Sequence, residues 1–184
     1  FRTGVNVGVN YAAQDLLANF DAVCLTCGAT KARDLLVPGR ELHGIHLAMD
    51  YLSQQNRLLA GEYIEPDKRI TAEGKRVVIL GGGDTGADCL GTAHRQGAEV
   101  VYQLELLSEP PLTRRPDNPW PLWPTILRTS AAHEEGGIRE YDALTKAFSG
   151  SNGRVERLHA VRVEWSQAGS NGRPSMKEIP NSDF

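Results

Sequence analysis

Cysteine is scarce in this 184-residue sequence, and so are long apolar runs and any surplus of positive charge. Three cysteines cannot form the dense disulfide framework of a small secreted domain, so the reducing cytoplasm is the expected compartment. No apolar run approaches the roughly 20 residues that a membrane-spanning helix needs. The formal net charge is −3, whereas a nucleic-acid-binding protein typically carries an excess of basic residues. The length and the 40% hydrophobic content predict one or two globular domains.

Glycine, by contrast, is abundant and gathers where one apolar run ends. The run Val77–Leu80 leads into a turn and a helix start made of Gly81, Gly82, Gly83, Asp84, Thr85 and Gly86. The first, third and sixth of these fit G-x-G-x-x-G in the order strand, turn and helix. In that motif the glycines make the turn, admit a pyrophosphate to the backbone and let the helix pack on the strand. The six residues are therefore predicted to bind a dinucleotide, the alternative being a glycine turn without a ligand.

The residues that follow favour the dinucleotide interpretation. Gly97 stands where a helix C-cap is expected, and the apolar run Val100–Leu104 predicts the next strand. Glu105 ends that run nineteen residues after the last motif glycine, close to where an acid binds the ribose 2′-hydroxyl. Arg114 and Arg115 could instead bind a 2′-phosphate. Because a strand places Glu105 while the arginines lie on a loop, the sequence favours NADH over NADPH.

The N-terminal third predicts short elements. The alternation over 5–9 indicates a strand, 11–20 a brief helix, 21–26 a buried strand and 46–59 a longer helix. Cys24 and Cys27 spell C-x-x-C but fall at the end of the buried strand rather than at a helix N-terminus. They are therefore interpreted as buried, unreactive cysteines rather than a redox pair.

The C-terminal half predicts a long loop followed by β-structure. Six prolines between 110 and 124 exclude regular elements there, and Trp120 and Trp123 are expected to cover a core edge. A short helix is expected within 125–135; its His133-Glu134 pair lacks the second histidine of a metal site. Alternating runs at 139–148, 155–165 and 176–179, with turns at 149–153 and 169–172, predict an antiparallel meander.

Several longer segments closely resemble the small (beta) subunit of glutamate synthase. They cover nearly the whole chain and lie at 20–31, 37–42, 81–89, 92–98, 118–124, 128–130 and 133–136. The resemblance implies an α/β fold: a Rossmann-like dinucleotide-binding domain with a parallel sheet plus the antiparallel meander, carrying a fragment of a flavin-binding domain. It places 1–44 in a partial FAD-domain segment and connector, with Gly28, Ala29 and Thr30 at the flavin edge. Residues 45–184 would form the NAD(P)H-binding domain.

The resemblance also implies a function. In the family, NAD(P)H gives a hydride to FAD, and the electrons pass over iron–sulfur clusters to a large subunit that makes glutamate from glutamine and 2-oxoglutarate. The cofactors carry that chemistry, so no side chain here is assigned a catalytic role. The chain reads as a piece of a longer protein, inactive alone, with FAD bound in the full-length enzyme. The alternatives are another flavin-dependent reductase and a non-catalytic nucleotide-binding module.

Overall fold

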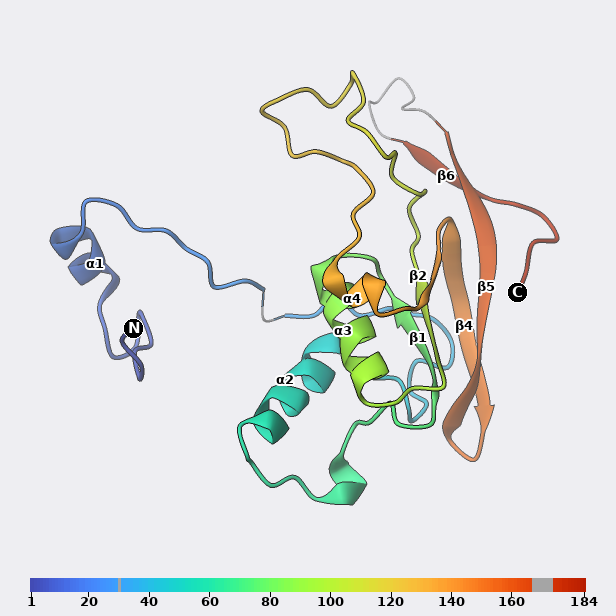
Figure 1. Cartoon of the computed structure of the whole chain (residues 1–184), viewed down its shortest axis with the longest axis horizontal. Helices are drawn as coiled ribbons and strands as arrows, with labels where there is room; N and C mark the ends of the chain where they lie inside the picture. Colours follow the sequence, from blue (N-terminus) through green and yellow to red (C-terminus); the bar gives the residue numbers. More distant parts are fainter. Residues whose placement is uncertain (30, 167–173) are drawn as a thin grey trace. The chain divides into compact units, whose positions relative to one another are not determined.

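The computed structural model describes residues 1–29, 31–166 and 174–184, and the chain divides into two compact units (Figure 1). The first unit is Phe1–Arg33 and the second is Asp34–Phe184. Within the described ranges, no helix is both long and apolar enough to cross a bilayer.

The described residues of the first unit contain one helix, α1 (Ala13–Asn19), as the sequence predicts. The two predicted strands are wrong: 5–9 has only an isolated bridge between Val7 and Tyr11, and 21–26 forms no strand. A strand is stable only beside a partner strand, and none of the described residues pairs with 21–26. Cys24 and Cys27 are consequently exposed, so the prediction that they are buried is also wrong.

The second unit is built on a parallel sheet. Its strands are β1 (Arg76–Leu80), β2 (Val100–Leu104) and β3 (Ile138–Glu140), in the order β1-β2-β3. The helix α3 (Asp84–Arg95) connects β1 to β2, which makes the predicted βαβ unit. Gly97 follows α3 with a φ of +83°, the left-handed conformation that its helix-ending role requires.

The core lies between α3 and one face of this sheet. Leu90 and Ala93 of α3 are fully buried against Val101 of β2, and Val77 and Ile79 of β1 pack beside them. The alternation along β1 produces this face, because residues two apart in a strand point the same way. Val78 and Leu80, on the other face, are 43% and 41% exposed.

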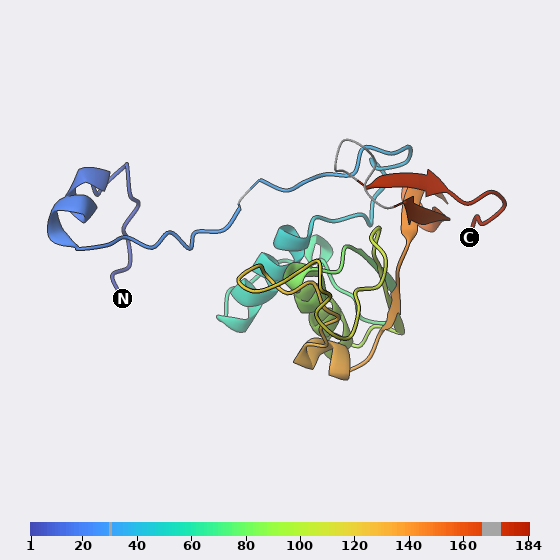
Figure 2. The ribbon, with the colours of Figure 1, turned by 90° about the horizontal axis from the view of Figure 1, so that it is seen from above.

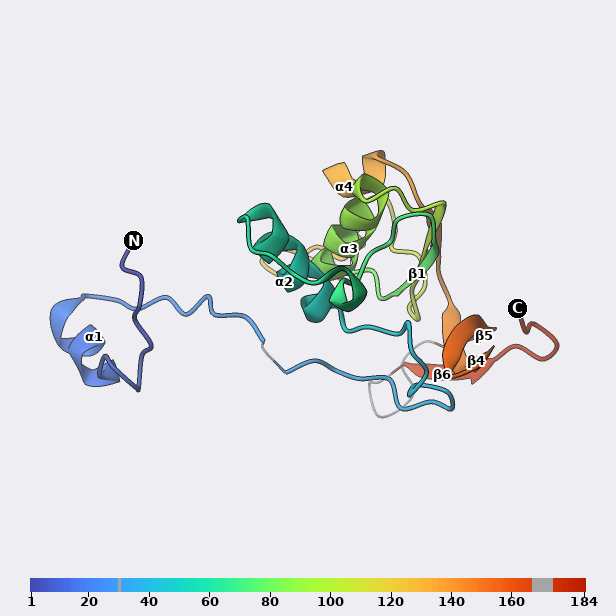
Figure 3. The ribbon, with the colours of Figure 1, turned by 90° about the horizontal axis from the view of Figure 1, so that it is seen from below.

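Two more helices flank α3, namely α2 (Ala48–Leu59) and the short α4 (Ala131–Glu134), so that α3 lies between them (Figure 2 and Figure 3). A 3-10 turn, η1 (Pro66–Lys68), lies between α2 and β1 in the chain. The Tyr51 hydroxyl of α2 donates to Gln96 Oε1 over 2.8 Å, and the Ala72 N–H donates to the same oxygen. Burial raises the pKa of Tyr51 to about 12, so its phenol stays a donor.

A second, antiparallel sheet follows with the order β4-β5-β6. Its strands are β4 (Ala143–Ser151), β5 (Arg154–Ser166) and β6 (Ser175–Glu178). Asn152 and Gly153 form the tight β4–β5 turn with φ of +51° and +72°, which confirms the first predicted hairpin. The second predicted turn, 169–172, lies outside the described residues.

One predicted strand is divided between the two sheets. The sequence alternates from 139 to 148, but Ile138–Glu140 pairs in parallel with β2, whereas Ala143 begins the antiparallel hairpin. The chain changes direction at Asp142, whose φ is +55°. Arg162 of β5 joins the sheets across this break, donating to Glu140 Oε2 at 2.6 Å and to the Tyr141 carbonyl at 2.8 Å.

Candidate functional site at the glycine-rich turn

The turn after β1 leaves backbone exposed at the start of α3. The Gly81 N–H donates to the Leu104 carbonyl at 2.9 Å, which ties the turn to β2, and Gly81 has a φ of +113° that favours glycine. Gly83 is the N-cap of α3 and supplies no side-chain cap. A Cβ at Gly83 would meet no atom within 4 Å. Open space therefore lies beside Gly83, at the positive end of the helix dipole, where first-turn N–H groups have no partner within the helix.

Gly86 serves the close packing that the motif predicts. A Cβ there would lie 2.3 Å from the Gly81 carbonyl oxygen and 2.7 Å from Gln103 Nε2. The helix thus passes too close to the turn for any side chain. Asp84 and Thr85, the first two residues of α3, are exposed, and the Asp84 carboxylate complements the helix dipole.

Glu105 and the turn, both predicted to bind the nucleotide, lie side by side. Glu105 follows β2, and its backbone is held by the Glu140 carbonyl at 2.8 Å and the Ala143 N–H at 2.9 Å. Its carboxylate covers Gly82: a Cβ on that glycine would fall 1.4 Å from Glu105 Oε1. Partial burial raises the pKa of Glu105, and the nearby Arg139 guanidinium opposes that rise. Arg139 was not predicted from the sequence.

A hydrogen-bond chain that sequence reasoning missed supports the turn, with its Gln103 end buried and its Ser130 end exposed. Gln103, fully buried on β2, donates from Nε2 to the Gly81 carbonyl at 2.9 Å. Its Oε1 lies 2.9 Å from His133 Nε2, and His133 Nδ1 accepts from the Ser130 N–H at 3.1 Å. His133 is therefore neutral, with its proton on Nε2. A glutamine inside an otherwise apolar strand is the signal that could have revealed the chain.

His133 makes the stability of the fold sensitive to pH. Burial, and then the charge of Arg139, lower the pKa of His133 from its ordinary value near 6.5. The unfolded chain therefore takes up this proton at a higher pH than the folded chain does. The neutral histidine contributes fully above about pH 6.5, and its contribution is lost as the pH falls from there through the folded-state pKa.

We therefore expect urea unfolding midpoints to fall between pH 7.5 and pH 5.5, and to fall less in a His133→Asn variant. His46, whose pKa is also lowered mainly by burial, contributes equally to both proteins and cancels from the comparison. An equal fall in the variant and the wild type would show that His133 does not titrate in this way.

Arg114 and Arg115 lie in a loop, and both are bound to other residues of the same loop. Arg114 Nη1 donates to the carbonyls of Asn118 at 3.1 Å and Leu122 at 3.0 Å, and Arg115 pairs with Asp117 at 3.1 Å. Among the described residues, neither forms a hydrogen bond or an ion pair with the glycine turn.

Trp120 and Trp123 of the same loop are 83% and 75% exposed, so the prediction that they cover a core edge is wrong. Arg128 lies 4.3 Å from the centre of the Trp123 ring. The loop is ordered by these internal contacts rather than by burial of its indoles.

The residues predicted at a flavin edge lie in the first unit. Gly28 has a φ of +66°, no atom lies within 4 Å of a Cβ built on it, and Ala29 is exposed. Thr30 lies outside the described residues.

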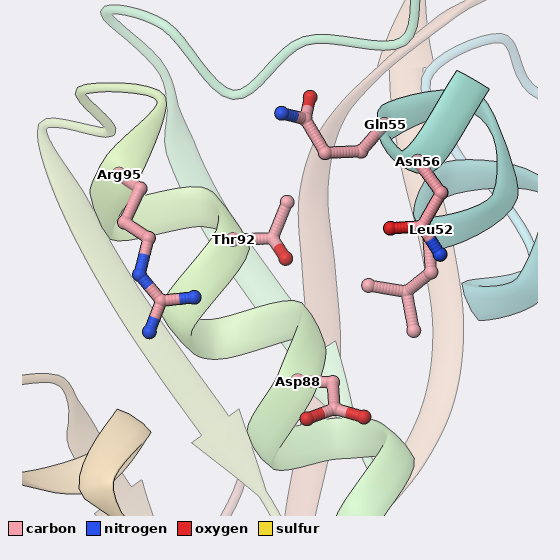
Figure 4. Close-up of a pocket in the computed structure, with 6 residues that line it drawn as sticks. All are labelled: Leu52, Gln55, Asn56, Asp88, Thr92 and Arg95. Carbon is pink, nitrogen blue, oxygen red and sulfur yellow. The ribbon is translucent and has the colours of Figure 1, made fainter. Parts of the chain in front are cut away.

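A separate pocket of about 220 Å³ lies between α2 and α3 (Figure 4). Its lining is mostly polar and consists of Leu52, Gln55, Asn56, Asp88, Thr92 and Arg95. None of these belongs to the glycine turn, so the pocket offers a rival place for a ligand.

The fold and the site thus define an α/β protein built on a βαβ unit with a glycine-rich turn. In sequence the chain is 54% identical, over 166 residues, to a Mycobacterium tuberculosis protein named glutamate synthase [NADPH] small chain. It is 37% identical over 190 residues to the Bacillus subtilis protein of that name, and 43% identical over 190 residues to glutamate synthase [NADH] of Schizosaccharomyces pombe. The chain is a homologue of part of the glutamate synthase small chain, which confirms the resemblance seen in its sequence.

The matches cover most of this chain but little of the relatives. The M. tuberculosis alignment covers 89% of this chain and 34% of the relative, and the S. pombe alignment covers 98% and 9%. No family model matches the chain. One solved structure, thioredoxin reductase of T. acidophilum, aligns with 58% of this chain and with 29% of the reductase chain. The identity is 17% and the TM-score 0.35, so this likeness carries no argument about the fold.

Proposed function

We propose that this chain is the NAD(P)H-binding part of a glutamate synthase small chain, with a Rossmann-like dinucleotide-binding domain at 45–184. One observation carries the proposal. Open space at Gly83, an uncapped helix start and the Glu105 carboxylate meet at the carboxyl ends of two adjacent parallel strands. Ligands of open α/β sheets bind at that edge. The names of the relatives, which include both NADPH and NADH enzymes, agree with it.

In this proposal the turn holds the nucleotide through its backbone. The N–H groups that open α3, at Asp84, Thr85 and Gly86, bind the pyrophosphate, and the helix dipole favours its charge. Glu105 accepts hydrogen bonds from the adenosine ribose. Gln103 holds the Gly81 carbonyl, so the turn is preorganised before the ligand arrives.

Within the full-length enzyme, bound NAD(P)H and FAD would supply the hydride transfer, and a large subunit would use the electrons to make glutamate from glutamine and 2-oxoglutarate. The described residues of the first unit include none that is buried, so we propose that FAD binding and turnover require parts of the longer relatives. Residues 1–44, with Gly28, Ala29 and Thr30, would contribute to that flavin domain. The cytoplasm is the proposed compartment.

Titration of the purified chain with NADH, NADPH and FAD tests the proposal. We expect one or both nicotinamide nucleotides to bind with dissociation constants of roughly 1 μM to 1 mM, the range of typical Michaelis constants. A purely structural module would bind neither nucleotide at millimolar concentration, and that result would overturn the proposal. Another flavin-dependent reductase would also bind the nucleotide; a mixture with a glutamate synthase large subunit separates the two, since only the proposed protein should associate with it.

A further inference from the structure

Arg139 lies at the edge of the sheet where the nucleotide is proposed to bind. It stands on β3 directly opposite Gln103 of β2, so both side chains lie on the α3 side of the sheet. Its Nη2 is 3.9 Å from Glu105 Oε1, and the two side chains are 20% and 19% exposed. Because the Glu105 carboxylate also lies against Gly82, the Glu105 side chain contacts both the turn and the guanidinium.

Most N–H donors of Arg139 form no hydrogen bond with the described residues. A guanidinium carries five N–H donors. One hydrogen bond is formed, from Nη1 to the Arg128 carbonyl at 3.0 Å, and the distance to Glu105 is too long for another. Nε is buried without a partner, as is the neighbouring Tyr141 hydroxyl, whose ring lies 5.4 Å from the guanidinium carbon. Within the described ranges Nη2 also forms no hydrogen bond, but it is not among the buried unpaired atoms, so it is the donor that an incoming acceptor can reach.

We propose that Arg139 binds the 2′-phosphate of NADPH and so determines which nucleotide the chain accepts. This inference rests on the proposed nucleotide site. A 2′-phosphate carries nearly two negative charges at neutral pH, and Glu105 alone would repel it. With Arg139 beside it, the carboxylate is compensated, and the guanidinium offers the forked donors that suit a phosphate. The chain therefore binds NADPH at least as tightly as NADH, contrary to the preference that Glu105 alone suggests.

The two arginines that the sequence singled out are less suited to this role. Arg114 already donates to two carbonyls of its own loop, and Arg115 is paired with Asp117. Each would have to give up these partners to bind a phosphate. Arg139 is instead fixed by a strand that is in register with the strand preceding Glu105.

Calorimetric titration of the chain with NADPH and NADH, on the wild type, Arg139→Met and Arg114→Met, tests the inference. We expect Arg139→Met to lose at least tenfold in NADPH affinity while its NADH affinity changes less than threefold. Arg114→Met serves as the matched control, because it removes the same charge from the rival position. Arg139→Lys keeps a positive charge and should retain part of the preference; it replaces Arg139→Met if that variant does not fold.

The outcomes separate the inference from the proposed function. If the wild type binds neither nucleotide, the proposed function fails and the inference fails with it. If both nucleotides bind but Arg139→Met and Arg139→Lys leave the NADPH to NADH affinity ratio unchanged, only the inference is overturned. A ratio that changes in Arg114→Met instead would assign the phosphate to the loop.

Discussion

Replacing Gly83 with valine should weaken binding of NADH and NADPH at least a hundredfold, about 2.8 kcal/mol, without unfolding the chain. Gly83 has a φ of −74°, which valine adopts freely, and a Cβ there meets no protein atom within 4 Å. The free protein therefore has room for the side chain. The proposed pyrophosphate does not, because it must approach the backbone at this position.

Two measurements make the Gly83→Val result specific. The thermal transition of the variant should fall by no more than a few degrees, because replacing an N-cap glycine with valine costs about 1 kcal/mol. Thr92→Val places a valine of nearly the same shape as the threonine in the α2–α3 pocket, and it should leave nucleotide binding intact. Loss of binding in Thr92→Val with full affinity in Gly83→Val would move the ligand to that pocket and contradict the account.

The second large effect concerns stability. Replacing glycine by alanine inside a helix normally stabilises a protein by about 0.5–1 kcal/mol. At Gly86 we expect the opposite, a loss of about 2–5 kcal/mol, since the new Cβ would clash with the Gly81 carbonyl and break its hydrogen bond from Gln103. The melting temperature should fall by roughly 5–15 °C.

Gly83→Ala is the matched control for Gly86→Ala, because it adds the same methyl group three residues away where space is open. Its melting temperature should stay within about 4 °C of the wild type, the shift that corresponds to the roughly 1 kcal/mol by which an N-cap favours glycine over alanine. A Gly86→Ala protein as stable as this control would show that α3 does not need the close approach to the turn.

The βαβ unit was predictable because its signals are local. The apolar run Val77–Leu80, the glycines behind it and Gly97 at the helix end each specify backbone geometry within a few residues. Local signals also predict that Glu105 ends the second strand, and it directly follows β2 next to Gly82; its binding of the ribose stays a prediction. Such signals failed for 21–26, where an apolar run predicts a strand but no described residue pairs with it.

The support of the site depends on contacts between residues far apart in the chain. His133 meets Gln103 across 30 positions, and Arg139 reaches Glu105 only because β3 pairs in parallel with β2. The alternation from 139 to 148 gave no sign of the reversal at Asp142 that sends β3 and β4 into different sheets. A single sequence does not specify such pairings, so its candidate arginines were those nearest in the chain rather than the one nearest in space.

A crystal structure of this chain with bound NADPH tests the central claim most directly, because it locates the pyrophosphate. We predict hydrogen bonds of about 2.7–3.2 Å from its oxygens to backbone N–H groups between Gly83 and Gly86, with the adenosine ribose beside Glu105. A dinucleotide found in the pocket between α2 and α3, or one whose pyrophosphate makes no contact with the turn, would contradict the account.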